Sequence, residues 1–204
     1  MKSYYVVVQL WLVALVSCMA AVAVSFMYAD VPMALFFSKS SNLLSPVGES
    51  LSSVVILSVE AVTVMALVLT RLVRGRLPPL AEAAGVACLT SICVYGIDSG
   101  VLKPVFGVPN PGEVLHGAKH AFNFFAGSPY SSFPSGHMTL AAAFAGVFMR
   151  LYRRSIWPLS ALLVFGAALL VAGEWHFLSD VIAGTFVGLS AGLLAAELWD
   201  VHSN

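Results

Sequence analysis

Long stretches without charged residues dominate the chain, and short polar clusters separate them. A helix that spans a membrane needs about 20 predominantly apolar residues. Six stretches of about this length predict six spanning helices. They lie at residues 2–30, 51–70, 83–98, 134–149, 155–173 and 180–196. We therefore expect an all-α polytopic membrane protein, a bundle of six transmembrane helices that forms one domain over residues 1–204.

A secretory signal peptide is the alternative interpretation of the first stretch, with Met27-Tyr28-Ala29 as its cleavage site. Signal peptides carry an apolar core of about 7–15 residues. Here Lys2 is followed by 27 uncharged residues before Asp30. The length therefore favours a helix that the protein retains.

Composition narrows the class of protein further. Hydrophobic residues make up 59% and charged residues 10% of the chain, with a mean hydropathy of +0.91. A soluble domain carries about 25% charged residues, and a disordered chain combines low hydrophobicity with a high net charge. The formal net charge is +0, whereas a nucleic-acid-binding surface is basic. We expect the bilayer as a partner and no nucleic acid.

Lysine and arginine are distributed unequally between the ends of the predicted helices. Positive residues next to spans accumulate on the cytoplasmic side. With both termini inside, seven of the ten lie on that side, namely Lys2, Arg71, Arg74, Arg76, Arg150, Arg153 and Arg154. The opposite side keeps Lys39, Lys103 and Lys119. This asymmetry indicates a bacterial inner membrane protein whose outer face looks toward the periplasm or exterior.

Two longer segments lie on the predicted outer side. Residues 30–50 combine Phe36 and Phe37 with several serines, a pattern that predicts a helix lying in the membrane interface. Residues 98–133 are the longest non-spanning segment and are rich in Gly, Pro, Asn and His; such loops are usually functional. The outer side also holds His116, His120, His137 and His176. Ionisable groups that converge on one membrane face indicate a site.

The residues Pro134-Ser135-Gly136-His137 predict an anion site at the start of the fourth stretch. Proline suits the first position of a helix, where its missing N–H is no loss. The following residues offer backbone N–H groups at the positive end of the helix dipole, and Gly136 lets an anion approach closely. Ser135 adds a hydroxyl donor, and His137 can hand a proton to a leaving group. Phosphate fits such a site.

Two further segments of the outer side carry candidate chemistry. His176 and Asp180 are four residues apart, which would put both on one face of a helix. A carboxylate that accepts from one ring nitrogen fixes the tautomer and leaves the other nitrogen as a base or nucleophile. Lys103 is either a snorkelling anchor at the end of a span or a point charge on a phosphate.

These three segments resemble, in order and spacing, the signature of the type-2 phosphatidic acid phosphatase superfamily. That signature reads Lys-x6-Arg-Pro, then Pro-Ser-Gly-His, then Ser-Arg-x5-His-x3-Asp, on a chain with six spans. Lys103 and Pro111 keep the first part, and residues 134–137 match the second part fully. His176 and Asp180 keep the third part. The six-span layout extends the resemblance over nearly the whole chain.

The resemblance implies a phosphatase of the acid-phosphatase type that uses neither a metal ion nor a cofactor. His176 would attack phosphorus to form a phosphohistidine, Asp180 would orient it, and His137 would protonate the leaving oxygen. Water would then release phosphate. The expected substrate-binding residues, within the motifs and on the same loop, are Lys103, Ser135, Gly136, Asn110, Lys119 and His120.

Two arginines of the signature are absent. Asn110 stands where the first part has arginine, and Leu169-Leu170 replaces Ser-Arg in the third part. All six arginines of the chain belong to the two predicted inner turns, so none would reach the outer pocket. The candidates that would compensate are Lys119 and His120, then His116 and Lys39.

Three alternative functions are compatible with these features of the sequence. The first is hydrolysis of a lipid phosphate or diphosphate, on a phospholipid or a polyprenyl chain, which the retained His176, Asp180 and His137 favour. The second keeps the phosphohistidine but passes the phosphoryl group to a lipid or glycan alcohol, because a less cationic pocket suits a less charged substrate. The third is a catalytically weak lipid-binding homologue, which only the missing arginines favour. The sequence leaves the lipid, the oligomeric state and the role of Glu174 open.

Overall fold

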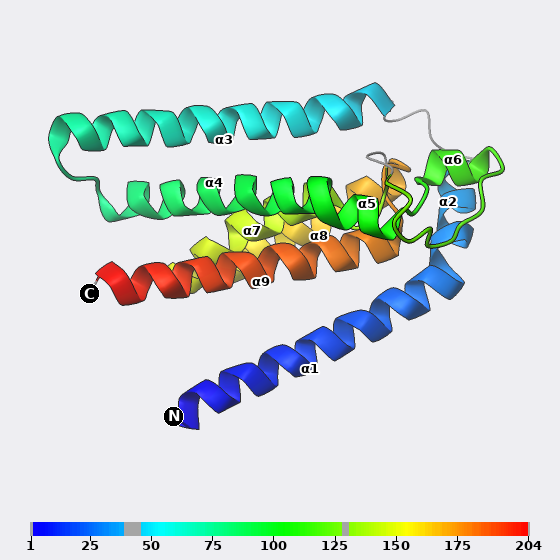
Figure 1. The fold of residues 1–204 in the computed structure, drawn as a ribbon, viewed down its shortest axis with the longest axis horizontal. Helices are drawn as coiled ribbons and strands as arrows, with labels where there is room; N and C mark the ends of the chain where they lie inside the picture. The colour runs from blue at the N-terminus through cyan, green and yellow to red at the C-terminus, as the bar shows by residue number, and fades with distance from the viewer. Residues whose placement is uncertain (1, 39–45, 128–130, 204) are drawn as a thin grey trace.

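The computed structural model describes residues 2–38, 46–127 and 131–203, and these residues form an all-α bundle (Figure 1). Five helical segments of the described chain are long and apolar enough to cross a membrane, and a sixth apolar helix, α7, is shorter. The helices that match the six predicted spans are α1 (Lys2–Val24), α3 (Pro46–Arg74), α4 (Pro79–Ile97), α7 (Gly136–Leu151), α8 (Ile156–Ala172) and α9 (Leu178–Ser203). The predicted fold class is confirmed.

The segment between the first two spans differs from the prediction. The first helix does not stop at Asp30 but passes through a π-helical turn, η1 (Ser25–Ala29), into α2 (Asp30–Ser38). The predicted interfacial helix over residues 30–50 therefore has α2 as its described part. Residues 39–45, with Lys39, lie outside the described residues. The second span begins at Pro46 rather than near residue 51, because proline is compatible with a first helical turn.

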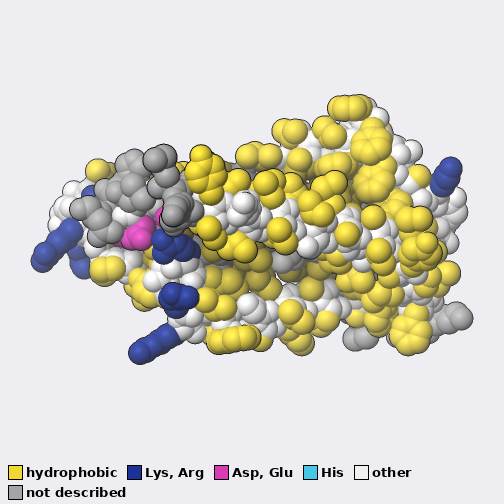
Figure 2. All heavy atoms as spheres, turned by 90° about the horizontal axis from the view of Figure 1, so that it is seen from below, with side chains coloured by type: hydrophobic (Ala, Val, Ile, Leu, Met, Phe, Trp, Pro, Cys, Tyr) yellow, Lys and Arg dark blue, Asp and Glu magenta, His cyan; other side chains and the backbone are white. Residues whose placement is uncertain are grey.

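Different segments of the chain lie at the two ends of the bundle. Both termini and the turn between α3 and α4 lie at one end, and α2, α5 (Lys103–Phe106) and α6 (Pro111–Leu115) lie at the other (Figure 1). Arg150 pairs with Glu197 and Asp200 near the C-terminal end of α9. Figure 2 shows a middle zone of hydrophobic side chains, with Lys and Arg toward the two ends.

Helix α7 forms the centre of the bundle, packed against α9 along its length. Three glycines of α9, at a spacing of four residues, face the backbone of α7. A Cβ atom on Gly188 would lie only 2.5 Å from the carbonyl oxygen of Thr139, and Gly184 and Gly192 approach Ser135 and Ala143 in the same way. Small residues at such a spacing let two helices approach closely. This contact fixes the start of α9 relative to the start of α7.

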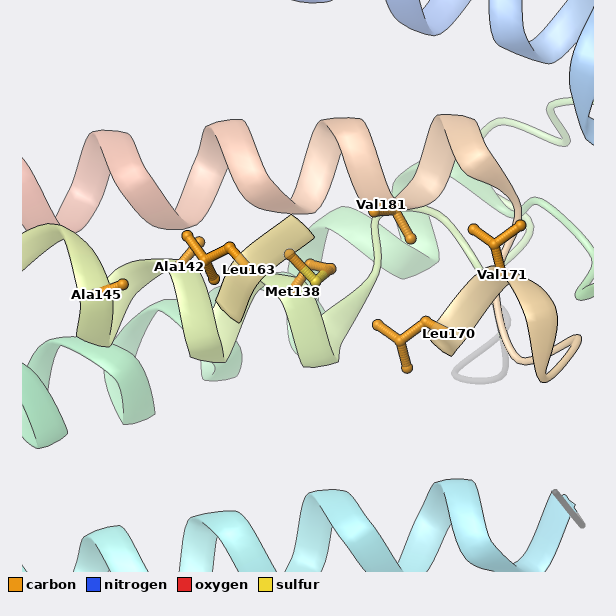
Figure 3. Close-up of a cluster of buried hydrophobic side chains, with 7 residues drawn as sticks. All are labelled: Met138, Ala142, Ala145, Leu163, Leu170, Val171 and Val181. Carbon is orange, nitrogen blue, oxygen red and sulfur yellow. The ribbon is translucent and has the colours of Figure 1, made fainter. Parts of the chain in front are cut away.

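A second set of contacts joins α7 to α8 and α9. Buried side chains from these three helices pack into one hydrophobic cluster (Figure 3). Its members are Met138, Ala142, Ala145, Leu163, Leu170, Val171 and Val181. Other helices enclose α7 along much of its length, because most of its residues are buried.

We expect Gly188→Ala to lower the apparent melting temperature of the detergent-solubilised protein by several degrees. The added methyl group meets rigid backbone, and overpacking costs about 1–3 kcal/mol. Gly166→Ala is the matched control, because a Cβ atom there meets nothing within 4 Å and alanine is the better helix former. Equal melting temperatures for the two variants would contradict the close packing of α7 and α9.

Candidate active site

His176 and Asp180 lie together just before and just inside the start of α9. Their Nδ1 and Oδ2 atoms are 3.6 Å apart, and both residues are almost completely buried. The expectation that they share one helix face is wrong, because α9 begins only at Leu178. The Asp180 carboxylate accepts a hydrogen bond of 2.8 Å from the backbone N–H of Phe177. This contact caps the start of α9 and turns the chain before it, so that His176 meets the carboxylate.

Ser132 is a member of this cluster that the sequence analysis did not include. Its hydroxyl donates to Oδ2 of Asp180 and lies 3.5 Å from Nδ1 of His176. Ser132 stands directly before the Phe133-Pro134 pair of the second motif. This position next to a motif is the one feature of the sequence that could have indicated its role in the cluster. The hydroxyl and the carboxylate both lie on the Nδ1 side of His176.

The chain reaches His176 through a Schellman ending of α8. Backbone N–H groups of Glu174 and Trp175 bond to the carbonyl oxygens of Val171 and Leu170, the pattern of that motif. Glu174 takes the left-handed position with φ of 58°, where glycine is usual. A strained residue two positions before His176 is typical of a functional site. Glu174 also lines a crevice beside His176.

The position of the missing second arginine is part of the core. Leu170 is only 8% exposed and packs within the hydrophobic cluster of Figure 3. Its backbone also closes the end of α8. An apolar side chain has therefore taken over a packing role at this position.

Burial and charge together keep His176 neutral. Burial, the largest cause, and the positive charge of Lys103 lower the pKa of His176 to about 3, against a hydrogen bond to the backbone of Ser132 that acts in the opposite direction. At neutral pH the imidazole therefore carries one N–H and one lone pair. A neutral imidazole whose Nδ1 faces a carboxylate is a suitable nucleophile.

The start of α7 lies against the same cluster. The helix begins at Gly136, and Ser135 is its N-cap, with the hydroxyl accepting from the backbone N–H of Met138 at 3.4 Å. Pro134 thus precedes the helix, and the expectation that it occupies the first helical position is wrong because Ser135 caps the turn instead. The N–H of Ser135 donates to the carbonyl oxygen of Asp180 at 3.0 Å. The first turn of α7 is therefore anchored beside His176.

His137 leaves the first turn of α7 and approaches His176. The two ring centroids are 5.7 Å apart in an edge-to-face arrangement, and the Trp175 ring is 5.6 Å from that of His137. Nε2 of His137 also lies within hydrogen-bond distance of Ser52 and Ser53, both from α3. No motif in the sequence pointed to these two serines.

Asp98 and Lys103 follow the C-terminal end of α4. A π-helical turn, η2 (Asp98–Leu102), leads into α5, and the N–H of Lys103 donates to the carbonyl oxygen of Asp98. The Asp98 side chain is completely buried, and neither of its oxygens has a hydrogen-bond partner among the described residues. A Cβ atom on Gly136 would lie 3.3 Å from Oδ2 of Asp98. The site therefore holds a lysine together with an additional carboxylate.

Of the other residues expected to bind substrate, Asn110 and His120 contact residues outside the His176 cluster, and Lys119 is exposed. Asn110 forms a capping box with Glu113 at the start of α6, and Lys119 is exposed on the following loop. The ring of His120 stacks on that of Phe26 at 4.1 Å, and its Nε2 lies 3.5 Å from Oδ2 of Asp30. Burial lowers the pKa of His120, and the charge of Asp30 acts in the opposite direction.

Asp30 connects this loop to the segment that contains His176 and Asp180. Its carboxylate accepts hydrogen bonds from the backbone N–H and the hydroxyl of Ser179, in the first turn of α9. A negative charge at the N-terminus of a helix is stabilising. The sequence analysis treated Asp30 only as the end of the first span. A carboxylate inside a continuous apolar helix was the signal for a further role.

No arginine lies at the end of the bundle that holds His176. Arg150 contacts residues near the C-terminal end of α9, whereas His176 precedes its N-terminus. At 1.5 Å per residue, the two ends of a helix of this length are separated by about 30–40 Å. Arg71 pairs with Glu82 across the turn between α3 and α4, at the same end as Arg150 (Figure 1).

Comparisons with known proteins agree with this arrangement. The model of the PAP2 superfamily matches residues 82–202, more than half of the chain. The lipid A 1-phosphatase of Rhizobium etli is 30% identical over 117 residues, which cover 56% of this chain and 50% of that protein. The lipid A 1-phosphatase of Rhizobium johnstonii is 32% identical over 108 residues, 52% of this chain and 44% of that protein.

The matched region has clear limits. The chain spans about half the length of the curated relatives it matches, and no solved structure matches it significantly. Within the chain, the region that matches the family model contains all three motif segments and the helices that hold them. The chain therefore belongs to the PAP2 superfamily.

Proposed function

We propose that this integral membrane protein is a lipid-phosphate phosphatase that forms a phosphohistidine on His176. The observation that carries the proposal is the buried neutral imidazole, oriented by Asp180 at 3.6 Å and flanked by His137 and the start of α7. Membership of the PAP2 superfamily supports it. A nucleophile, an orienting carboxylate and a second histidine are the groups that a two-step displacement at phosphorus requires.

The proposed reaction has two balanced steps. Nε2 of His176 attacks phosphorus, the bond from phosphorus to the lipid oxygen breaks, and His137 gives a proton to that oxygen. Water then attacks phosphorus, its proton passes to His137, and the bond between phosphorus and His176 breaks. Asp180 holds the Nδ1 side of His176 throughout. The chain's own side chains supply every group in these steps, so we propose that neither a metal ion nor a cofactor takes part.

Lys103, Ser135 and Gly136 are proposed to hold the phosphoryl oxygens. The start of α7 offers backbone N–H groups at the positive end of the helix dipole, and Lys103 supplies a positive charge close enough to lower the pKa of His176. Asn110, Lys119 and His120 are proposed to act farther from phosphorus. Asn110 contacts Glu113, and His120 contacts Asp30 at the start of α2.

The proposed substrate is the phosphomonoester of a membrane lipid. Two relatives are lipid A 1-phosphatases, so a phosphorylated glycolipid is the first candidate, with phosphatidic acid and a polyprenyl diphosphate as the others. We propose that the protein lies in a bacterial inner membrane, with cytoplasmic termini and the site facing the periplasm. The separation of the arginines from the histidines supports this orientation.

A phosphotransferase is the second candidate, and the lack of arginine favours it. A hydrogen bond to a charged group contributes roughly 1.5–3 kcal/mol, so a pocket without both arginines holds a phosphate dianion less strongly. Such a pocket suits a donor of lower charge, from which the phosphoryl group passes to an alcohol. Transfer to an added lipid alcohol without free phosphate would identify this activity.

The proposal is tested by phosphate release from the purified protein in detergent. The substrates are lipid A, phosphatidic acid and a polyprenyl diphosphate, each assayed with and without a chelator. We expect phosphate from at least one lipid, at the same rate in both conditions. Turnover that the chelator abolishes would refute the metal-free mechanism, and lipid binding without turnover on all three would favour a catalytically weak homologue.

A further inference from the structure

Two hydroxyl groups of α3 meet one ring nitrogen of His137. Nε2 of His137 lies 2.7 Å from Oγ of Ser52 and 2.9 Å from Oγ of Ser53. Ser58 and Thr63, farther along α3, instead donate to the carbonyl group four residues earlier in their own helix. Hydroxyl groups in apolar helices commonly do this. Ser52 and Ser53 therefore differ from the hydroxyls that follow them, because they reach another helix.

Around these serines, α3 presents an apolar surface. Val54, Val55 and Val59 are exposed on a helix that is apolar enough to span a membrane, and Figure 1 shows α3 alongside α4. The two hydroxyls thus form a polar contact on a helix whose exposed side chains nearby are apolar. This contact joins α3 to the ring that neighbours His176.

A serine hydroxyl is suited to a group that changes its protonation state. It accepts a hydrogen bond from a protonated Nε2 and donates one to a bare Nε2. One imidazole nitrogen carries either one proton or one lone pair, so the two hydroxyls share it and each contributes to orienting the ring. One of them occupies a place next to Nε2 that a substrate oxygen can take.

We propose that Ser52 and Ser53 are positioning residues that hold His137 for proton transfer to the leaving group. This inference rests on the proposed function. When the lipid binds, its leaving oxygen replaces one serine at Nε2 and shares the single Nε2 proton with the other serine, which keeps the ring in place. As the bond from Nε2 of His176 to phosphorus forms and the bond to the lipid oxygen breaks, the Nε2 proton of His137 moves to that oxygen. The remaining serine then donates to the bare nitrogen.

The test compares two leaving groups. A lipid alkoxide needs a proton as it departs, whereas 4-nitrophenolate departs without one. We expect Ser52→Ala and Ser53→Ala each to lower kcat on phosphatidic acid by about tenfold, and the double variant by about a hundredfold, the range for lost hydrogen bonds. KM should change less than about twofold, and turnover of 4-nitrophenyl phosphate should fall less than about threefold.

Three comparisons separate positioning from a loss of structure. Ser58→Ala removes a hydroxyl from the same helix and should leave kcat unchanged. The double threonine variant keeps both hydroxyls and should recover most of the activity that the double alanine variant loses. In a His137→Gln background, the serine substitutions should cause no further loss, because the group that they position is gone.

Equal losses on both substrates, a loss confined to KM, or a further loss in the His137→Gln background would each overturn the inference. A second readout does not depend on turnover. With ¹⁵N-labelled histidine, the Nε2 signal of His137 should shift in the double alanine variant and not in Ser58→Ala. An unchanged signal would overturn the inference. An unreactive protein that still shows the shift would instead refute the proposed function and leave the contact established.

Discussion

His176→Ala is expected to reduce phosphate release from the lipid substrate by at least about a thousandfold. The substitution removes the atom that attacks phosphorus, and removal of a nucleophile that works with an orienting group abolishes most of an enzyme's rate enhancement. Burial keeps this imidazole neutral, with a pKa of about 3, so the wild-type protein holds a usable lone pair at every pH that a phosphatase assay covers. The measurement is initial rate at saturating lipid.

His116→Ala is the matched control for this variant. His116 is an exposed histidine on the same end of the bundle, with its Nδ1 2.7 Å from the carbonyl oxygen of Gly112. We expect its rate to stay within about threefold of the wild type. A His176→Ala protein with substantial residual release, and with an unchanged melting temperature, would remove His176 from the role of nucleophile.

Asp180→Asn is expected to lower kcat by about 10³–10⁴-fold with little change in KM. The N–H of Phe177 and the hydroxyl of Ser132 both donate to Oδ2 of Asp180, the oxygen that faces Nδ1 of His176. The amide oxygen of asparagine can take that place and keep the cap of α9, but it carries no negative charge to hold the Nδ1 side of the imidazole. Replacing the aspartate by asparagine has an effect of this size in other enzymes with a histidine and an aspartate. The loss should therefore appear in the chemical step.

The control for Asp180→Asn is Asp200→Asn. Asp200 lies at the other end of α9, 3.6 Å from Arg150, and the same change of charge there should leave kcat unaffected. A loss for Asp180→Asn that is accompanied by a large fall in melting temperature would indicate a purely structural carboxylate. Full activity in this variant would show that His176 does not need the carboxylate.

The helices could be predicted from the sequence because each is a run of apolar residues bounded by charge. Helix ends depend instead on local caps. Ser135 caps α7, which begins at Gly136, two residues after the start that Pro134 suggested, and the Asp180 carboxylate caps the start of α9 at Leu178, which leaves His176 outside the helix. Apolar patterning does not contain this information, because a cap is decided by one side chain and one backbone N–H group.

The candidate site could be predicted only where its residues form local motifs. His137, His176 and Asp180 were identified from short segments, and the structure brings them together. Ser52 lies 85 residues from its partner His137, and a serine near the end of a span has no feature that distinguishes it from its neighbours. Contacts of this kind depend on how α3 and α7 pack against each other. The spacing of residues along the chain does not predict that packing.

The most direct test of the central claim is to trap the phosphorylated protein. The wild type is mixed with ³²P-labelled lipid phosphate, quenched within milliseconds to seconds in denaturant at alkaline pH, and digested for peptide mapping. We predict label that is stable to base, lost in acid and carried by the peptide containing His176, with none in His176→Ala. Turnover without a labelled intermediate, or label on another residue, would contradict the proposed mechanism.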